Sequence, residues 1–204
     1  LKNAKKTLES WGLEVVISKH AAGEAGRFSG SVKQRTADLQ WAMDDESTKA
    51  ILCSRGGYGA IHLIDQIDFT KFRENPKWLL GYSDITLLHE LLQYNGFASV
   101  HSPMARHLSV EPKDDVCSLH LKNLLFGELP TYQSPKHKLN IKGTAKGTLR
   151  GGNLSVLYGL RGTPYDFPAE GTILFIEDIG ENFYALDRML MSLDLAGVFR
   201  KIKG

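Results

Sequence analysis

The chain has 204 residues, of which 42% are hydrophobic and 24% charged, and its formal net charge is +2. This balance is typical of a globular protein and excludes a disordered chain, a fibrous repeat and a strongly basic nucleic-acid-binding domain. Two cysteines cannot build a disulfide framework, no apolar run approaches the roughly 20 residues of a membrane span, and no signal peptide is found, which together favour a cytoplasmic protein.

Apolar strands and amphipathic helices alternate in the first part of the chain. Residues 1–10 predict a helix that Gly12 ends, and Ser31 is a suitable N-cap for a helix over 32–45. The other expected elements are strands at 13–17, 50–53, 78–81 and 97–101, and helices at 61–67, 85–94 and 114–126. Solid apolar strands are expected to be buried on both faces, so we predict an α/β fold with a doubly wound, mostly parallel, Rossmann-like sheet. Ligands then bind beyond the carboxyl ends of the strands.

The composition changes at Pro130–Pro135, and we expect a domain boundary there. Residues 1–135 would form an N-terminal Rossmann-like domain, and residues 136–204 the start of a smaller, β-rich domain. Expected elements of the second domain are a β-hairpin over 139–150, a short helix over 153–160, a strand over 172–176 and a helix over 181–196. Residues 198–204 suggest the approach to another strand. No strand precedes the first helix, so we expect an internal piece of a longer protein, with both domains incomplete.

Ser83 is the first candidate for chemistry, because it stands at a strand-to-helix turn two residues after Gly81. Such an elbow projects Oγ out of the sheet, and the following helix N-terminus offers N–H groups and a dipole that favour an oxyanion. The motif Gly-Tyr-Ser-Asp-Ile lacks the second glycine of G-x-S-x-G. From local sequence alone, the simpler interpretation is favoured, in which Ser83 or Asp84 only caps the helix.

Residues 55–59, Arg-Gly-Gly-Tyr-Gly, form a second strand-to-helix turn. Glycines let the backbone approach a ligand and let N–H groups point inward. A phosphate cradle, an oxyanion donor for a nearby serine and a plain turn without a ligand all stay open, since neither nucleotide-binding glycine motif is present.

Acidic residues and histidines supply further candidates. Glu177 and Asp178 end an apolar strand and could orient a histidine or bind a cation, although a helix N-terminal charge cluster with Glu181 is the simpler interpretation. His101 could be a general base, but a structural histidine is more common at such positions. Cys53 lies inside an apolar run and fits a buried small hydrophobe better than a nucleophile. No two histidines show metal-ligand spacing with a carboxylate, so no metal site is predicted.

Six motifs in series resemble the LD-carboxypeptidase family of serine peptidases, which includes the microcin immunity hydrolases. They are Gly-Arg-Phe-Ser-Gly at 26–30, Arg-Gly-Gly-Tyr-Gly at 55–59, Gly-Tyr-Ser-Asp-Ile-Thr at 81–86, His-Ser-Pro-Met at 101–104, Gly-Gly-Asn-Leu at 151–154 and Leu-Phe-Ile-Glu-Asp at 174–178. They follow the family's order and cover nearly the whole chain. Each motif alone is weak evidence for the resemblance, whereas all six in this order are specific to the family.

The resemblance implies a Ser-His-Glu triad in which Ser83 is the nucleophile and Glu177 orients the imidazole. Backbone N–H groups near Gly57 and of Asp84 would form the oxyanion hole.

In the family, the catalytic histidine lies near the end of the second domain in a Gly-His context. No such context occurs before Gly204, and His101 belongs to a different family motif. We therefore expect the base to lie outside this chain and residues 1–204 alone to be inactive. Asn153 and Glu181 are the expected substrate-binding residues.

The implied reaction is attack of the serine on an L,D-amide bond, followed by hydrolysis of the acyl-enzyme by water. The family substrate is the murein tetrapeptide, which loses its terminal D-Ala during cytoplasmic cell-wall recycling. Neither an organic cofactor nor a metal is implied. The expected partner is a small murein peptide, with a homodimer left open and neither nucleic acid nor a membrane expected.

Two other functions stay open. One is an immunity-type hydrolase of a peptidyl-nucleotide toxin, which would differ from the carboxypeptidases in the loops that line its pocket. The other is a non-catalytic α/β module that holds a small anionic ligand at Gly56–Gly57.

Overall fold

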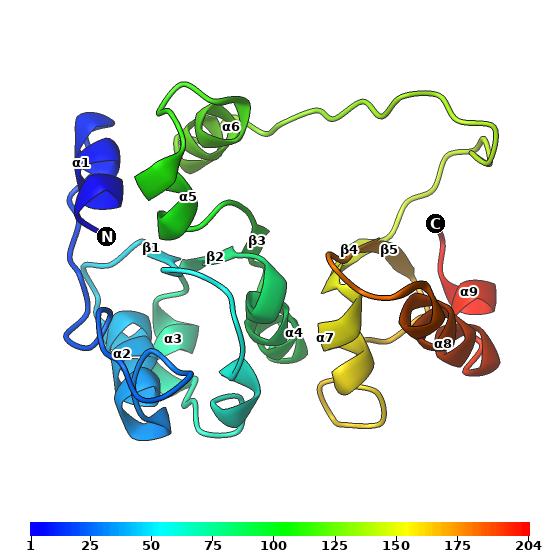
Figure 1. Cartoon of the computed structure of the whole chain (residues 1–204), viewed down its shortest axis with the longest axis horizontal. Coiled ribbons are helices and arrows are strands. Elements are labelled where there is room, and N and C mark those ends of the chain that lie inside the picture. The colour runs from blue at the N-terminus through cyan, green and yellow to red at the C-terminus, as the bar shows by residue number, and fades with distance from the viewer.

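Two groups of parallel strands organise the computed structural model, which describes all 204 residues (Figure 1). Strands β1 (Ala50–Leu52), β2 (Trp78–Gly81) and β3 (Val100–His101) form one sheet in that order, with both pairs parallel. Strands β4 (Thr148–Asn153) and β5 (Thr172–Glu177) form a separate parallel pair. The predicted mixed α/β fold with parallel strands is confirmed.

Nine α-helices accompany the strands, and none has the length and apolar character needed to span a membrane. They are α1 (Lys2–Ser10), α2 (Val32–Asp44), α3 (Thr70–Glu74), α4 (Thr86–Tyr94), α5 (Ala105–Val110), α6 (Val116–Leu125), α7 (Leu154–Gly159), α8 (Phe183–Leu195) and α9 (Val198–Lys201). Two 3₁₀ turns, η1 (Ala60–His62) and η2 (Ser83–Ile85), follow the carboxyl ends of β1 and β2. Helices α3 and α5 have no counterpart among the predicted elements.

Helices lie on both faces of the β1–β3 sheet, with α1, α5 and α6 on one side and α2 and α3 on the other (Figure 1). Leu79 of β2 belongs to the same core as Met43 of α2. The next residue, Leu80, packs with Leu8 of α1 and Leu108 of α5. Because successive strand residues point to opposite faces, β2 is buried on both sides, as its solid apolar sequence predicts.

Capping explains where two of the helices begin or end. The Ser31 hydroxyl accepts a hydrogen bond from Gln34 N at 3.2 Å, and the Gln34 side chain accepts from Ser31 N at 2.9 Å, which completes a capping box at α2. Gly12 follows α1 with φ +90°, in the left-handed region where glycine is favoured. Both features match the sequence prediction.

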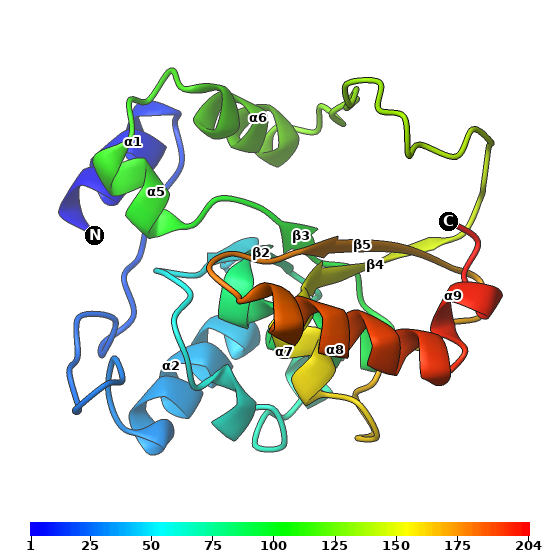
Figure 2. The same cartoon turned by 45° about the vertical axis from the view of Figure 1, so that its right-hand side comes forward.

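The second group of elements has its own core. Leu157 of α7 and Leu193 of α8 pack together with Phe167, against Leu174 of β5. Figure 2 shows α7 and α8 on the same side of the β4–β5 pair. Residues 126–147 contain no helix or strand and join α6 to β4 (Figure 1).

Two predicted strand segments are wrong. Residues 13–17 are not a strand, because no ladder hydrogen bond joins them to β1, and Leu13 and Val15 instead pack against the cluster formed by α1 and α5. Residues 139–150 are not a hairpin. Only the end of this segment enters a strand, β4, and its partner is the distant β5 in parallel register, while residues 139–147 stay exposed.

Two further elements differ from the prediction. Residues 61–67 form turns with i→i+3 hydrogen bonds, such as Leu63 N to Ala60 O, rather than an α-helix. Residues 198–201 form α9 where an approach to a strand was expected. The chain then runs beside β5, because Lys203 N donates to Thr172 O and Leu174 N donates to Gly204 O.

Candidate active site

Ser83 stands on a strained backbone between β2 and α4. Its φ is +64°, and it is the one residue other than glycine with a positive φ. An L-residue in this region costs on the order of 1–2 kcal/mol, and such strain is concentrated at functional sites. The Ser83 side chain caps neither η2 nor α4, so the simple helix-cap interpretation finds no support in the hydrogen bonding. The half-buried side chain is left free for another role.

The glycine-rich turn after β1 packs directly against this serine. A Cβ atom added at Gly56 would lie 2.8 Å from Ser83 Cβ and 2.9 Å from Ser83 Oγ. Gly81 is equally constrained, because its added Cβ would lie 2.9 Å from Ile85 Cγ1. The two turns that the sequence singles out separately therefore form one structure, in which glycine is needed on both sides of the serine.

Asp84 fastens the two turns together. Its Oδ2 accepts a hydrogen bond from Ala60 N at 2.8 Å, and the residue is only 7% exposed. Burial raises the pKa of Asp84, an effect that this hydrogen bond and the positive charge of Arg35 oppose. Arg35 Nη1 donates to Gly59 O at 3.1 Å, so a second residue holds the same loop. Between these anchors, Gly57 has φ +113° and open space where a Cβ would stand.

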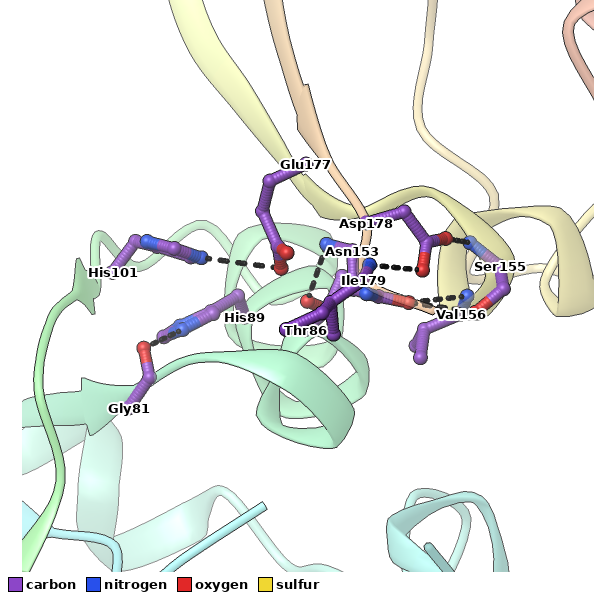
Figure 3. A network of polar contacts seen from close by, with 10 residues as sticks. All are labelled: Gly81, Thr86, His89, His101, Asn153, Ser155, Val156, Glu177, Asp178 and Ile179. Atoms are coloured by element: carbon purple, nitrogen blue, oxygen red, sulfur yellow. Dashed lines mark hydrogen bonds and ion pairs between the residues drawn. The ribbon is translucent and has the colours of Figure 1, made fainter. Parts of the chain in front are cut away.

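Strand β4 docks on the first turn of α4, next to the serine. Asn153 N donates to Thr86 Oγ1 at 3.0 Å (Figure 3). A Cβ at Gly152 would overlap the Thr86 side chain, so the close approach requires glycine. Glu177 is the β5 partner of Asn153 in the parallel ladder. The docking thus brings the end of β5 to the same edge as the carboxyl ends of β2 and β3.

Glu177 presents an unsatisfied oxygen at this edge. Its Oε1 is buried without a hydrogen-bond partner, and it lies 4.0 Å from His101 Nε2 (Figure 3). Burial raises the pKa of Glu177, with the neighbouring Asp178 adding to the rise and a hydrogen bond from Asn153 opposing it. Buried polar oxygens normally have a donor, so this carboxylate has the capacity to accept one more hydrogen bond.

His101 lies between the two parts of the structure without bonding to the serine. Its ring contacts Phe175 at a centroid distance of 5.0 Å and Tyr82 at 6.1 Å. Burial lowers the pKa of His101, which favours the neutral imidazole. None of the seven histidines forms a hydrogen bond with Ser83.

His89 has a structural role, because its ring binds the backbone of Gly81, two residues before the serine. Its Nε2 lies 2.9 Å from Gly81 O and its Nδ1 lies 2.8 Å from Ser99 Oγ. Burial lowers the pKa of His89 to about 4, so the ring is neutral and holds the end of β2.

The remaining candidate residues fall into different environments. Asn153 is 6% exposed, and its Oδ1 caps α7 by accepting a hydrogen bond from Val156 N at 3.2 Å. Glu181 is exposed before α8 and has no hydrogen bond or ion pair with the site. Burial raises the pKa of the Cys53 thiol to about 12, which agrees with its interpretation as a small hydrophobe. No group of three or more histidine, cysteine or acidic side chains is arranged to hold a metal.

Some contacts at the site were not predicted from the sequence. The Asp84–Ala60 and Thr86–Asn153 hydrogen bonds join residues 24 and 67 positions apart. The one sequence signal for them is the placement of Asp84 and Thr86 just after the serine, at a helix start, where short polar side chains are common.

Comparison with known proteins places both parts of the chain in one family. Residues 1–102 match the family model of the LD-carboxypeptidase N-terminal domain, and residues 146–204 match that of the LD-carboxypeptidase C-terminal domain.

Individual relatives agree with these matches. The chain is 38% identical over 195 residues to a probable murein peptide carboxypeptidase from Bacillus subtilis, with 93% of this chain and 61% of that protein covered. The crystal structure of a muramoyltetrapeptide carboxypeptidase from Oxalobacter formigenes superposes with a TM-score of 0.85 at 30% identity, covering 99% of this chain and 68% of the other. An MccF-like protein from Bacillus anthracis gives a TM-score of 0.85 at 27% identity, covering 98% and 69%. The chain thus spans less than two thirds of the length of the Bacillus subtilis relative.

Proposed function

Because the chain belongs to the LD-carboxypeptidase family, we propose that the protein is a serine carboxypeptidase that removes a C-terminal D-amino acid from a murein tetrapeptide. The observation that carries the proposal is the strained Ser83 elbow, whose side chain abuts Gly56 of the glycine-rich turn. The names of the Bacillus subtilis and Oxalobacter formigenes relatives support murein peptide as the substrate. We place the reaction in the cytoplasm, in cell-wall recycling.

In the proposed reaction, Ser83 Oγ attacks the carbonyl carbon of the L,D-amide bond while an imidazole takes its proton. The oxyanion accepts hydrogen bonds from the backbone N–H groups of Asp84 and Gly57. The imidazolium then protonates the leaving amine, and the D-amino acid departs. Water, deprotonated by the same imidazole, hydrolyses the acyl-enzyme. Glu177 accepts the other N–H of the imidazole and stabilises its positive charge, a role for which its unpartnered buried oxygen is suited.

We propose that this imidazole comes from a part of the complete protein outside residues 1–204. The resemblance to the family places the catalytic histidine late in the second domain, and no histidine of this chain bonds to Ser83. His101 is the competing candidate, because it lies 4.0 Å from Glu177. We also propose that residues 1–135 form the nucleophile domain and that residues 136–204 begin the second domain.

The proposal is tested by replacing the nucleophile in the complete protein and measuring release of D-alanine from murein tetrapeptide. We expect Ser83→Ala to lower kcat by about 10⁴-fold or more, by analogy with other catalytic triads. Ser10→Ala, at an exposed position on α1, is the matched control and should leave turnover unchanged. Unchanged turnover in Ser83→Ala would remove this residue from the site.

The same assay distinguishes the remaining alternatives. Cleavage of a peptidyl-nucleotide conjugate without cleavage of the tetrapeptide would replace the carboxypeptidase by the immunity-type hydrolase. His101→Gln should retain most of the activity if the base lies elsewhere. A loss in His101→Gln as large as in Ser83→Ala would instead assign the base to His101.

A further inference from the structure

Glu90 is a buried carboxylate of α4 that the proposed reaction does not use. It is 1% exposed, and neither of its carboxylate oxygens accepts a hydrogen bond. Its one ion pair is with Arg150 of β4, whose Nη1 lies 3.5 Å from Glu90 Oε2. An ionised carboxylate is costly to bury unless a cation lies beside it, so Glu90 depends on Arg150 to stay charged at this position.

This ion pair joins the element that carries the serine to the element that carries the acid. Helix α4 continues from the turn that contains Ser83, and β4 is paired with β5, which ends at Glu177. A second polar contact joins the same two elements, because Asn153 N donates to Thr86 Oγ1 at 3.0 Å (Figure 3). The position of β4 on α4 therefore rests on two polar contacts, and both lie between the proposed nucleophile and its acid.

The two contacts have matching separations on the helix and on the strand. Thr86 and Glu90 are four residues apart, which places them on one face of α4 about 6 Å apart along its axis. On β4, Arg150 and Gly152, which abuts Thr86, are two residues apart, or about 6.6 Å along a strand. Two contacts at matched separations fix both the register and the angle of β4 on α4. A single contact would leave β4 able to pivot.

The energetics favour a positioning role for the pair over a stabilising one. Burial raises the pKa of Glu90 to about 7, an effect that the positive charge of Arg150 opposes and the negative charge of Asp166 reinforces. The attraction of Arg150 therefore does not fully compensate for the loss of water around the carboxylate. An apolar pair of similar volume is often as stabilising as a buried ion pair, whereas the ion pair specifies one arrangement. The buried leucines of α4 provide non-directional packing, which does not specify a register.

The angle of β4 determines where the carboxylate of Glu177 lies. Glu177 is the ladder partner of Asn153, and paired strands are about 4.8 Å apart. With the length of the side chain added, a rotation of about 10° around the Thr86–Asn153 contact would move this carboxylate by about 1 Å. A misplacement of about 1 Å in a catalytic group costs on the order of 10²-fold in rate.

We propose that Glu90 and Arg150 are positioning residues, whose ion pair sets the angle of β4 on α4 and thereby holds Glu177 at the distance from Ser83 that one imidazole can bridge. This inference rests on the proposed function and deepens it, because it assigns the alignment of nucleophile and acid to a named pair. Both residues act through Glu177 and not on the substrate.

The test replaces the ion pair by an apolar pair in the complete protein, and measures the melting temperature and the release of D-alanine from murein tetrapeptide. Assays are run above the pKa of Glu90, so that the pair of the parent protein is charged. Glu90→Leu alone strands the Arg150 charge and should lower the melting temperature by about 10 °C. Glu90→Leu combined with Arg150→Met should recover most of this loss. Its kcat should stay about 10- to 100-fold below that of the parent protein with KM little changed, because the orientation of Glu177 matters in the transition state.

Two further variants separate lost alignment from lost stability. Glu90→Asp keeps the charge but withdraws the carboxylate from Arg150 by one methylene group, so it should lower kcat in a folded protein. Lys77→Met is the control, because Lys77 is a buried cation at the start of β2, away from the docked β4. Lys77 is 5% exposed and donates to Met43 O at 2.8 Å. Its replacement should lower the melting temperature and leave kcat unchanged.

A crystal structure of the Glu90→Leu, Arg150→Met protein gives a readout that does not depend on turnover. We expect the Glu177 carboxylate to be displaced by about 1 Å relative to Ser83. An unchanged position of Glu177 would overturn the inference. Recovery of kcat together with the melting temperature in the double variant, or an unchanged kcat in folded Glu90→Asp, would also overturn it.

The outcomes separate this inference from the proposed function. If the parent protein hydrolyses the tetrapeptide and the variants keep its kcat, the positioning role fails and the proposed function stands. If the parent protein does not hydrolyse the tetrapeptide but Glu177 is displaced in the double variant, the proposed function fails and the role of the pair in holding Glu177 stands.

Discussion

A single methyl group at Gly56 should disable the serine without unfolding the protein. In Gly56→Ala, the new Cβ would lie 2.8 Å from Ser83 Cβ, whereas ordinary contacts begin at 3.4 Å. The serine and the loop must therefore move apart by about 0.6 Å. A misplacement of about 1 Å in a reacting group costs on the order of 10²-fold in rate, so we expect kcat to fall by about 10- to 100-fold. The backbone of Gly56 does not have a positive φ, and alanine is compatible with it.

The assay is release of D-alanine from murein tetrapeptide by the complete protein, with thermal unfolding measured in parallel. The melting temperature of Gly56→Ala should stay within a few degrees of that of the parent protein, since the clash is local. Gly143→Ala is the matched control, because Gly143 has no positive φ and no atom within 4 Å of an added Cβ. A folded Gly56→Ala protein with unchanged kcat would refute the contact between the glycine-rich turn and the nucleophile.

Three further predictions concern stability and reactivity. Burial raises the pKa of Glu90 to about 7 from 4.5, so the folded state keeps a proton that the unfolded state releases, and the free energy of unfolding should fall as pH rises through this window. For Glu90→Gln, the free energy of unfolding measured with urea should fall by up to about 3 kcal/mol less than that of the parent protein over the same pH range. The same pH dependence in both proteins would contradict the raised pKa of Glu90. Thr86→Val should cost about 1–3 kcal/mol in urea unfolding by stranding the buried Asn153 N–H, whereas Thr86→Ser should cost less; equal losses would exclude the hydroxyl as the cause. In the native protein a thiol reagent should modify exposed Cys117 faster than half-buried Cys53, whose thiol pKa burial raises to about 12, and equally fast reaction of both would contradict that raised pKa.

Local signals predicted the parts of the fold that depend on local physics. The capping box at Ser31 and the solid apolar strand at 78–81 are encoded within a few residues, and both are found where they were expected. Residues 13–17 have the composition of a strand, but a strand also needs a partner for its hydrogen bonds. Residues 139–150 alternate as a hairpin does, yet the partner of β4 is β5, and no pattern within the segment specifies that register.

The candidate site likewise combines features that a local motif predicts with contacts between distant segments that it does not. The sequence identified Ser83 and the glycine-rich turn as separate candidates, because each has a local motif. That Gly56 abuts the serine depends on the pairing of β1 with β2, and that Glu177 of the second group reaches the edge where β3 ends depends on docking of β4 onto α4. Contacts of this kind join residues that are far apart in the chain, so periodicity and spacing do not predict them.

The most direct test of the nucleophile is covalent labelling of the complete protein with a fluorophosphonate, followed by intact mass measurement and peptide mapping. We expect one equivalent of the probe on Ser83 Oγ, and no labelling in Ser83→Ala. A protein that hydrolyses the tetrapeptide but carries the probe at another residue, or resists the probe entirely, would contradict the assignment of Ser83 as the attacking group.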